Sequence, residues 1–199
     1  MRLPFLFLFL FSFTAQAVEV VDDIGQTIQL SKPAQRIISL APHATELLFD
    51  AGAGTKIIGA VKYSNFPQAA KKIPQVGGYK KLDIERIVRL QPDLIVAWQT
   101  GNRTAEMSQL KKLGITVFYT EPKELPGIAS LLMRLGKLAG TEQQATQAAN
   151  HFTKNYLLLK KQYQDKQSLR AFYQIWDKPL MTVNKDHLIT DVMRLCGLQ

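Results

Sequence analysis

The sequence offers few side chains that could act as a nucleophile. The candidates are Ser39, Ser64 and the single cysteine, Cys196. In α/β hydrolases the nucleophilic serine sits in a G-x-S-x-G turn between a strand and a helix. Neither serine has that sequence around it. An exported α/β hydrolase therefore remains only as an alternative from a different functional class.

The three histidines give no stronger sign of catalysis. His43 follows Pro42 at the expected start of a helix, where it could face a ligand, although a solitary surface histidine is the more common case. His151 and His187 fall in segments expected to be helical. We interpret both as surface residues.

Metal and phosphate sites are not indicated either. No pair of histidines or cysteines has the spacing of metal ligands. The segment Gly52-x-Gly54 lacks the lysine of a phosphate-binding loop. The sequence therefore predicts no catalytic residues, no metal and no cofactor, and the protein is not expected to be an enzyme.

Three aromatic residues follow a pattern that favours ligand binding. Tyr63 and Trp98 each come at or just after the end of an apolar run expected to be a buried strand, and Tyr79 lies in a glycine-rich turn expected at the same level. In open α/β sheets, ligands bind at the edge where the strands end. Flat aromatic rings suit a large, planar, partly apolar ligand. We predict that the three residues form one rim of a binding cleft.

The elements that must position this rim can be predicted from hydrophobic patterns. Continuous apolar runs bounded by turn residues predict strands that are buried on both faces. These runs span residues 36–40, 56–61, 94–98 and 115–119. Segments with helical periodicity lie between them, over residues 42–52, 84–90 and 104–113. This alternation predicts an α/β fold whose parallel sheet has helices on both faces.

The rest of the chain suggests a division into segments. A hairpin is expected over residues 18–30 and an amphipathic helix over 125–138, which completes an N-terminal lobe over 18–140. A helix over 141–166, uninterrupted by Gly or Pro, would be about 37 Å long. Such a helix could be a strut between two lobes or a long helix that covers the sheet.

The last segment, residues 167–199, resembles the start of a second α/β lobe. We expect strands over 169–176 and 180–183 and a helix over 187–195. About thirty residues cannot bury a core of their own. We therefore expect the chain to be the front part of a longer protein. Cys196 would then be a reactive thiol, part of an intermolecular bridge, or a cysteine whose partner is missing.

The N-terminus and the charge bear on where the protein acts. Residues 1–17 combine a positive start, a run of Leu and Phe, and the small-x-small motif Ala15-Gln16-Ala17. This pattern is typical of a signal peptide, because about ten apolar residues are too few for the roughly 20 that span a bilayer. The net charge is +9, but the basic residues are scattered. We interpret them as a solvated surface and expect no nucleic-acid partner.

Several segments resemble a known family. They are RIISLAPHATELLF, YSNFP, and LQPDLIVAW with the following GN. They are similar to the cobalamin-binding proteins of bacterial periplasms, which belong to a wider class of siderophore, haem and cobalamin receptors with a helical backbone. The first segment and L-x-P-D-L mark the wider class, whereas Y-S-x-F-P and A-W-x-x-G-N favour cobalamin.

The resemblance implies a monomeric periplasmic protein that captures a corrinoid between two lobes and delivers it to the permease of an ATP-driven importer. By position, Tyr63 and Trp98 correspond to aromatic residues that contact the corrin. Tyr79 stands where a relative has tryptophan. Glu85 corresponds to a glutamate that pairs with an arginine of the permease. The helix over 141–166 would link the lobes and limit their closure.

The resemblance also implies that parts of the site lie beyond Gln199. Cys196 corresponds to a cysteine whose disulfide partner lies there too. We therefore expect the chain to bind cobalamin weakly. A ferric-siderophore or haem receptor of the same class remains the alternative, although an anionic siderophore would favour clustered arginines rather than this aromatic rim.

Overall fold

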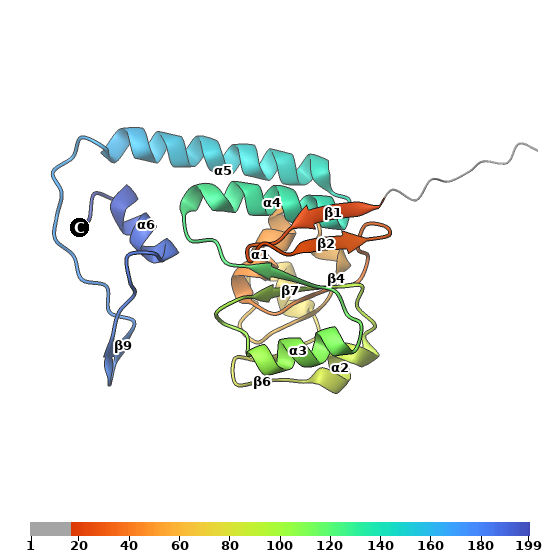
Figure 1. Ribbon diagram of the computed structural model, residues 1–199. Helices are drawn as coiled ribbons and strands as arrows, with labels where there is room; N and C mark the ends of the chain where they lie inside the picture. Colours follow the sequence, from red (N-terminus) through yellow and green to blue (C-terminus); the bar gives the residue numbers. More distant parts are fainter. Residues whose placement is uncertain (1–16) are drawn as a thin grey trace, which may run out of the picture.

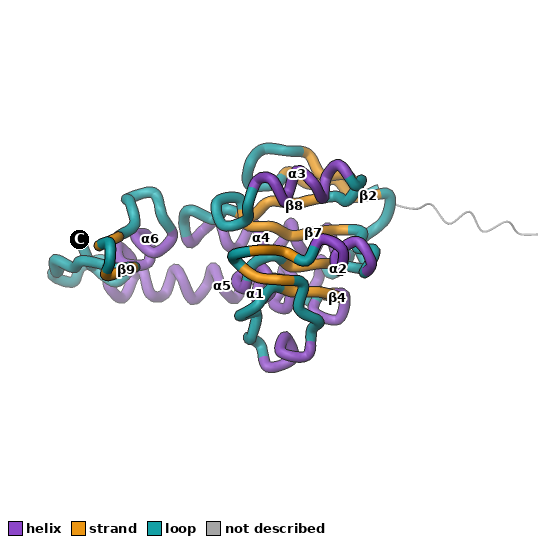
Figure 2. Tube along the Cα trace, turned by 90° about the horizontal axis from the view of Figure 1, so that it is seen from below, coloured by secondary structure: helices purple, strands orange, loops and turns teal. Residues whose placement is uncertain are grey.

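A computed structural model describes residues 17–199 (Figure 1). The predicted signal peptide, apart from Ala17, lies outside the described residues. The centre of the fold is a four-stranded parallel sheet with the order β4-β3-β7-β8. Its strands are Ile37–Ser39 (β3), Ile57–Ala60 (β4), Leu94–Trp98 (β7) and Val117–Thr120 (β8). Figure 2 shows β4, β7 and β8 running side by side.

The sheet divides the apolar residues into two cores, because successive side chains of a strand point to opposite faces. Ile37 and Phe118 enter the core under α1 (Pro42–Asp50) and α4 (Leu125–Ala139). Their neighbours Ile38 and Val117 enter the core under α2 (Ile84–Arg89) and α3 (Thr104–Lys112). Figure 1 shows α4 above the sheet and α2 and α3 below it. The predicted α/β fold with helices on both faces is confirmed.

Local signals explain where the helices start and stop. Pro42 occupies the first turn of α1, where its missing N–H costs nothing. Asp83 caps α2, since its side chain accepts a hydrogen bond from the backbone N–H of Arg86 at 2.9 Å. Gly140 ends α4 with a φ of 66°, a left-handed conformation that favours glycine.

The predicted hairpin is also present. β1 (Val18–Val21) and β2 (Thr27–Leu30) pair antiparallel and place Val18, Val20 and Ile28 against the α4 core. Three short elements were not predicted. They are the 3₁₀ helices Gly54–Lys56 (η1) and Gln68–Lys72 (η2), and the small hairpin of β5 (Gly77–Gly78) with β6 (Lys81–Leu82).

The long helix α5 (Glu142–Tyr163) packs along α4 and is slightly shorter than predicted. Beyond it come a hairpin of β9 (Trp176–Asp177) with β10 (Leu180–Met181), and the helix α6 (Leu188–Leu195). Figure 1 shows α6 beside the C-terminal half of α5, and β9 farther from α5, below α6.

The strand predicted over residues 169–176 is wrong except at its end, and the one over 180–183 is shorter than predicted. The segment from Arg170 to Ile175 is irregular, and Leu169 makes only an isolated bridge to Leu198. A strand needs a neighbouring strand to satisfy its backbone. Here no sheet lies alongside, and no residue after Ala149 is buried.

No helix within residues 17–199 combines the length and the apolar character needed to cross a membrane.

Candidate functional site

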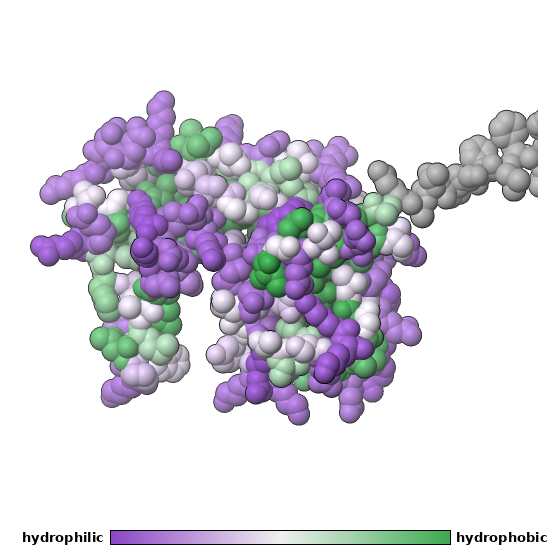
Figure 3. All heavy atoms as spheres, viewed as in Figure 1, coloured by the Kyte–Doolittle hydropathy of each residue, from purple (hydrophilic) through white to green (hydrophobic). Residues whose placement is uncertain are grey.

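A cavity of about 370 Å³ lies where the strands of the parallel sheet end. Its walls are one side of α1, the end of β7, the loop after β8, a residue near the start of α4, and the first residues of α6 with those just before it. The lining residues are His43, Glu46, Leu47, Asp50, Trp98, Glu121, Pro122, Lys123, Ile128, Asp186, His187, Leu188 and Ile189. Figure 3 shows that the molecule is hollowed between the C-terminal segment and the sheet lobe.

Trp98, the last residue of β7, is the predicted rim residue that lines this cavity. Its backbone N–H donates to Asn102 Oδ1 at 2.7 Å, and Asn102 Nδ2 donates to the carbonyl oxygen of Leu40 at 3.0 Å. Gly101 lies so close to the indole ring that an added Cβ would overlap it. The Gly-Asn pair after Trp98 therefore closes a turn that fixes the indole.

His43 packs against Trp98 and completes the aromatic part of the wall. The two ring centroids are 5.4 Å apart with an interplanar angle of 89°, an edge-to-face contact. His43 Nε2 lies 3.1 Å from Thr120 Oγ1. Burial lowers the pKa of His43 below its usual 6.5, and the charge of Glu121 partly opposes this. Of the two alternatives for His43, a ligand-facing residue or a solitary surface histidine, the structure favours the first, since the ring forms a wall of the cavity.

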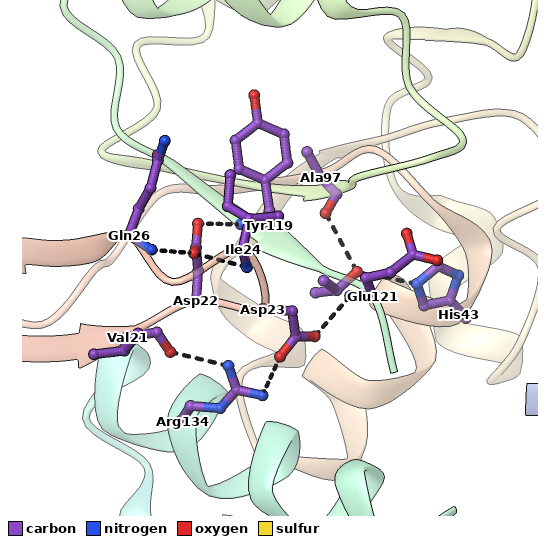
Figure 4. A network of polar contacts seen from close by, with 11 residues as sticks. Val21, Asp22, Asp23, Ile24, Gln26, His43, Ala97, Tyr119, Glu121 and Arg134 are labelled. Carbon is purple, nitrogen blue, oxygen red and sulfur yellow. Dashed lines mark hydrogen bonds and ion pairs between the residues drawn. The ribbon is translucent and has the colours of Figure 1, made fainter. Parts of the chain in front are cut away.

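A polar network holds Glu121 at the cavity (Figure 4). Asp23 accepts hydrogen bonds from the Glu121 backbone N–H at 2.6 Å and from the Arg134 guanidinium at 2.6 Å. Arg134 also donates to the carbonyl oxygen of Val21 at 2.9 Å. On the other side, the backbone N–H of Thr100 donates to Glu121 Oε2 at 3.0 Å. The β1–β2 hairpin and α4 therefore fix the backbone at Glu121, and Thr100 holds its carboxylate.

Tyr63 lies in the loop after β4, and the two serines considered as nucleophiles hold that loop in place. Thr45 Oγ1 lies 2.9 Å from Ser39 Oγ and 3.0 Å from Ser64 Oγ, in a buried cluster. This cluster ties the loop to the start of α1. Tyr63 itself has a φ of 70° and is 81% exposed. It lies outside the lining of the cavity.

Tyr79 forms the tip of the β5–β6 hairpin and is 82% exposed. The hairpin is joined to the loop that holds Tyr63, because the backbone N–H of Lys62 donates to the carbonyl oxygen of Gly77 at 2.9 Å. The structure thus places Trp98 in the cavity and leaves Tyr63 and Tyr79 on the surface. That either tyrosine contacts a ligand stays a prediction.

Comparison with known proteins establishes the family. Residues 37–199 match the family described as "Periplasmic binding protein". The chain belongs to this family. It is a family of binding proteins, which agrees with the prediction that the chain is not an enzyme.

Individual relatives and solved structures are more specific than the family description. The vitamin B12-binding protein of Vibrio cholerae is 38% identical over 165 residues, which are 83% of this chain and 60% of that protein. The crystal structure of the periplasmic vitamin B12-binding protein of Vibrio cholerae matches with a TM-score of 0.79, over 84% of this chain and 66% of that one. A possible iron-binding, periplasmic solute-binding protein of Staphylococcus epidermidis is 25% identical with a TM-score of 0.72, over 84% of this chain and 67% of that one. The chain spans 60% of the length of the curated relatives it matches.

Two further predicted residues lie away from the cavity of this family member. Glu85 is exposed in the first turn of α2, on the face of the sheet opposite to α4. Cys196 is an exposed free thiol directly after α6. Docking at Glu85 and pairing of Cys196 remain predictions. Within residues 17–199, no group of three or more His, Cys, Asp or Glu side chains could hold a metal ion.

Proposed function

We propose that this protein is the periplasmic solute-binding component of an ATP-driven cobalamin importer. It captures the corrinoid at the cavity beside Trp98 and delivers it to the membrane permease. The observation that carries the proposal is the pairing of Trp98 with His43 at the carboxyl edge of the sheet. The similarity to the vitamin B12-binding protein of Vibrio cholerae, in sequence and in structure, supports it.

The charge of the cavity favours cobalamin over the alternatives of the same class. Four carboxylates line it, from Glu46, Asp50, Glu121 and Asp186, against the single cation Lys123. Anionic ferric siderophores and the carboxylates of haem carry negative charge, which such a wall repels. The wall is acidic although the whole chain has a net charge of +9. A corrinoid with uncharged amide side chains fits this wall better.

The hydrolase alternative finds no support at the serines. Ser39 and Ser64 are both buried, and their hydroxyl groups bond to Thr45 rather than to a histidine. A nucleophilic serine needs a base within hydrogen-bond reach.

The proposed partners follow from the positions of the remaining predicted residues. Tyr63 and Tyr79 extend the contact area beyond the cavity, because a corrin with its side chains is larger than about 370 Å³. Exposed Glu85 is the docking residue for an arginine of the permease. The protein acts in the periplasm as a monomer after removal of residues 1–17.

Binding by the 199-residue chain is expected to be weak. The second wall of the cavity is formed by residues 186–189, in a segment without a buried residue. Part of the contact energy is therefore used to order that segment. The expected dissociation constant is about micromolar or weaker, roughly −8 kcal/mol or less favourable.

Fluorescence quenching tests the proposal. The chain has two tryptophans, so a Trp176→Phe variant isolates the signal of Trp98. Cyanocobalamin should quench this signal with saturation, whereas haem and ferric siderophores should not. The matched Trp98→Phe variant, which reports through Trp176, corrects for light absorbed by the ligands. Saturable quenching by haem or a siderophore alone would refute the cobalamin assignment, and a sub-micromolar constant would refute the expected weakness.

A further inference from the structure

His43 makes one hydrogen bond that defines its protonation pattern. Thr120 Oγ1 donates its only hydrogen to the carbonyl oxygen of Ala97, at 3.2 Å. The same hydroxyl oxygen lies 3.1 Å from His43 Nε2 and can only accept there. Nε2 must therefore carry a hydrogen, and in the neutral ring Nδ1 carries the lone pair.

Two features keep this ring neutral. Burial opposes the charged form and lowers the pKa of His43. The residue is also the second of α1, where the positive end of the helix dipole disfavours another positive charge. A neutral His43 is a hydrogen-bond acceptor at Nδ1.

Nδ1 is available to a ligand. Within residues 17–199, the hydrogen bond to Thr120 is the one that His43 makes through its ring. The ring lines the cavity, and Figure 4 shows its second nitrogen pointing away from Thr120. The carboxylates that line the cavity beside it, from Glu46, Asp50 and Glu121, also only accept. Lys123 and His187 in the same lining can donate, but within residues 17–199 neither is hydrogen-bonded to His43.

We propose that His43 is a specificity-determining residue of this cavity, whose Nδ1 accepts a hydrogen bond from a side-chain amide N–H of the ligand. A carboxylate at the same place has no hydrogen to donate and meets a lone pair instead. The cavity therefore selects corrinoids whose side chains end in amides over those in which an amide is replaced by a carboxylate. This inference rests on the proposed cobalamin function and identifies the side-chain amide as the ligand group that the site recognises.

Binding of two corrinoids tests the contact. The probes are cyanocobalamin and its monocarboxylic acids, in each of which one side-chain amide is hydrolysed, measured by Trp98 quenching in the Trp176→Phe background. The parent chain should bind cyanocobalamin roughly tenfold more tightly than the monocarboxylic acid whose changed group faces His43. His43→Phe keeps a ring against Trp98 but has no lone pair, so it should reduce this ratio to about twofold or less by weakening cyanocobalamin.

Two further variants separate the contact from a structural role. His151→Phe makes the same change at an exposed position of α5 and should leave the ratio unchanged. Thr120→Val removes the acceptor that fixes the tautomer, so the ratio should fall while the His43 ring stays. Nitrogen-15 NMR of the ligand-free chain should show a protonated Nε2 and a bare Nδ1, and Thr120→Val should mix the two tautomers.

The outcomes are distinct. A ratio that His43→Phe and Thr120→Val leave at the parent value, or a bare Nε2 by NMR, overturns the inference and leaves the cobalamin function standing. Equal binding of both corrinoids by the parent chain would also overturn the inference and leave the cobalamin function standing. A chain that binds neither corrinoid overturns the proposed function and the inference with it.

Discussion

Trp98 owes its orientation to the two residues that close the turn after β7. Asn102 bonds to the backbone at Trp98 and Leu40 and so joins the ends of two neighbouring strands. Gly101 leaves the space in which the indole lies. The Gly-Asn pair thus places an aromatic face at the cavity without using a side chain of its own for ligand contact.

Replacing Gly101 should disturb ligand binding more than stability. In Gly101→Ala the new Cβ would overlap the six-membered ring of Trp98, so the indole must move. We expect a shifted Trp98 emission maximum in the Trp176→Phe background and roughly tenfold weaker quenching by cyanocobalamin. Gly127→Ala is the control, since its Cβ would meet no atom within 4 Å. An unchanged emission maximum in Gly101→Ala would show that Gly101 does not position the indole.

The position of Trp98 at the binding edge of the sheet could be predicted because this residue ends a continuous apolar run. That signal lies within one segment of the sequence. The sequence did not predict the role of His43. The contacts of His43 with Trp98 and Thr120 join residues 55 and 77 positions apart in the sequence. The local signal was the Pro-His pair at the start of a helix. This pair places His43 on the helix but does not show which distant residues it contacts. The sequence likewise did not show whether Ser39 and Ser64 act as nucleophiles or hold the structure together. The structure shows that both hydroxyl groups bond to Thr45.

At the scale of elements, α4 and α5 pack together and cover one face of the sheet. The two helices meet where Gly136 of α4 faces Ala145 of α5, so closely that a Cβ on Gly136 would overlap that of Ala145. Ala145 and Ala149 are the buried residues of α5. Small residues on both helices let the backbones approach. α4 also carries Arg134, which bonds to Asp23, and Asp23 in turn accepts a hydrogen bond from the backbone N–H of Glu121.

The close approach predicts opposite effects of two similar substitutions in α4. Gly136→Ala should lower the free energy of unfolding by about 1–3 kcal/mol, because α5 must shift to make room. Gly127→Ala, near the start of the same helix, should raise it by up to about 1 kcal/mol, because alanine favours the helix and the position is open. Urea unfolding followed by circular dichroism measures both. If both variants gained stability, the tight helix contact would be disproved.

Elements with one clear hydrophobic pattern were predictable. The four apolar runs form the four strands of the parallel sheet. A continuous apolar run implies a strand covered on both faces, and helices do cover both faces of this sheet. The run over 169–176 has the same composition, yet it forms no strand up to Ile175. Composition describes a strand's side chains, whereas a sheet also needs a partner strand, which no other described segment provides at this place.

At the scale of the whole molecule, burial is unevenly distributed. Both hydrophobic cores consist of residues from Val18 to Ala149. After Ala149 no residue is buried, and large apolar side chains lie on the surface. They include Leu157, Leu158, Phe172, Trp176 and Leu180. Within residues 17–199, the one hydrogen bond from the segment after α5 to the sheet lobe runs from the backbone N–H of Leu125 to Asp191 Oδ2, at 2.7 Å.

This distribution predicts two levels of stability within one chain. Amides in β3, β7 and β8 should exchange with solvent only by global unfolding, because both faces of their sheet are buried. Amides over residues 167–199 should exchange by local opening at free energies near zero, since little apolar area is lost when the segment detaches. Hydrogen exchange followed by mass spectrometry distinguishes the two.

Two variants test the bond between α6 and α4. Asp191→Asn weakens this bond and should speed exchange in α6 alone. Asp186→Asn, a matched change outside that bond, should leave the exchange unchanged. Protection of α6 equal to that of β7 would contradict the expected separation and show that the second wall of the cavity is as firmly held as the first.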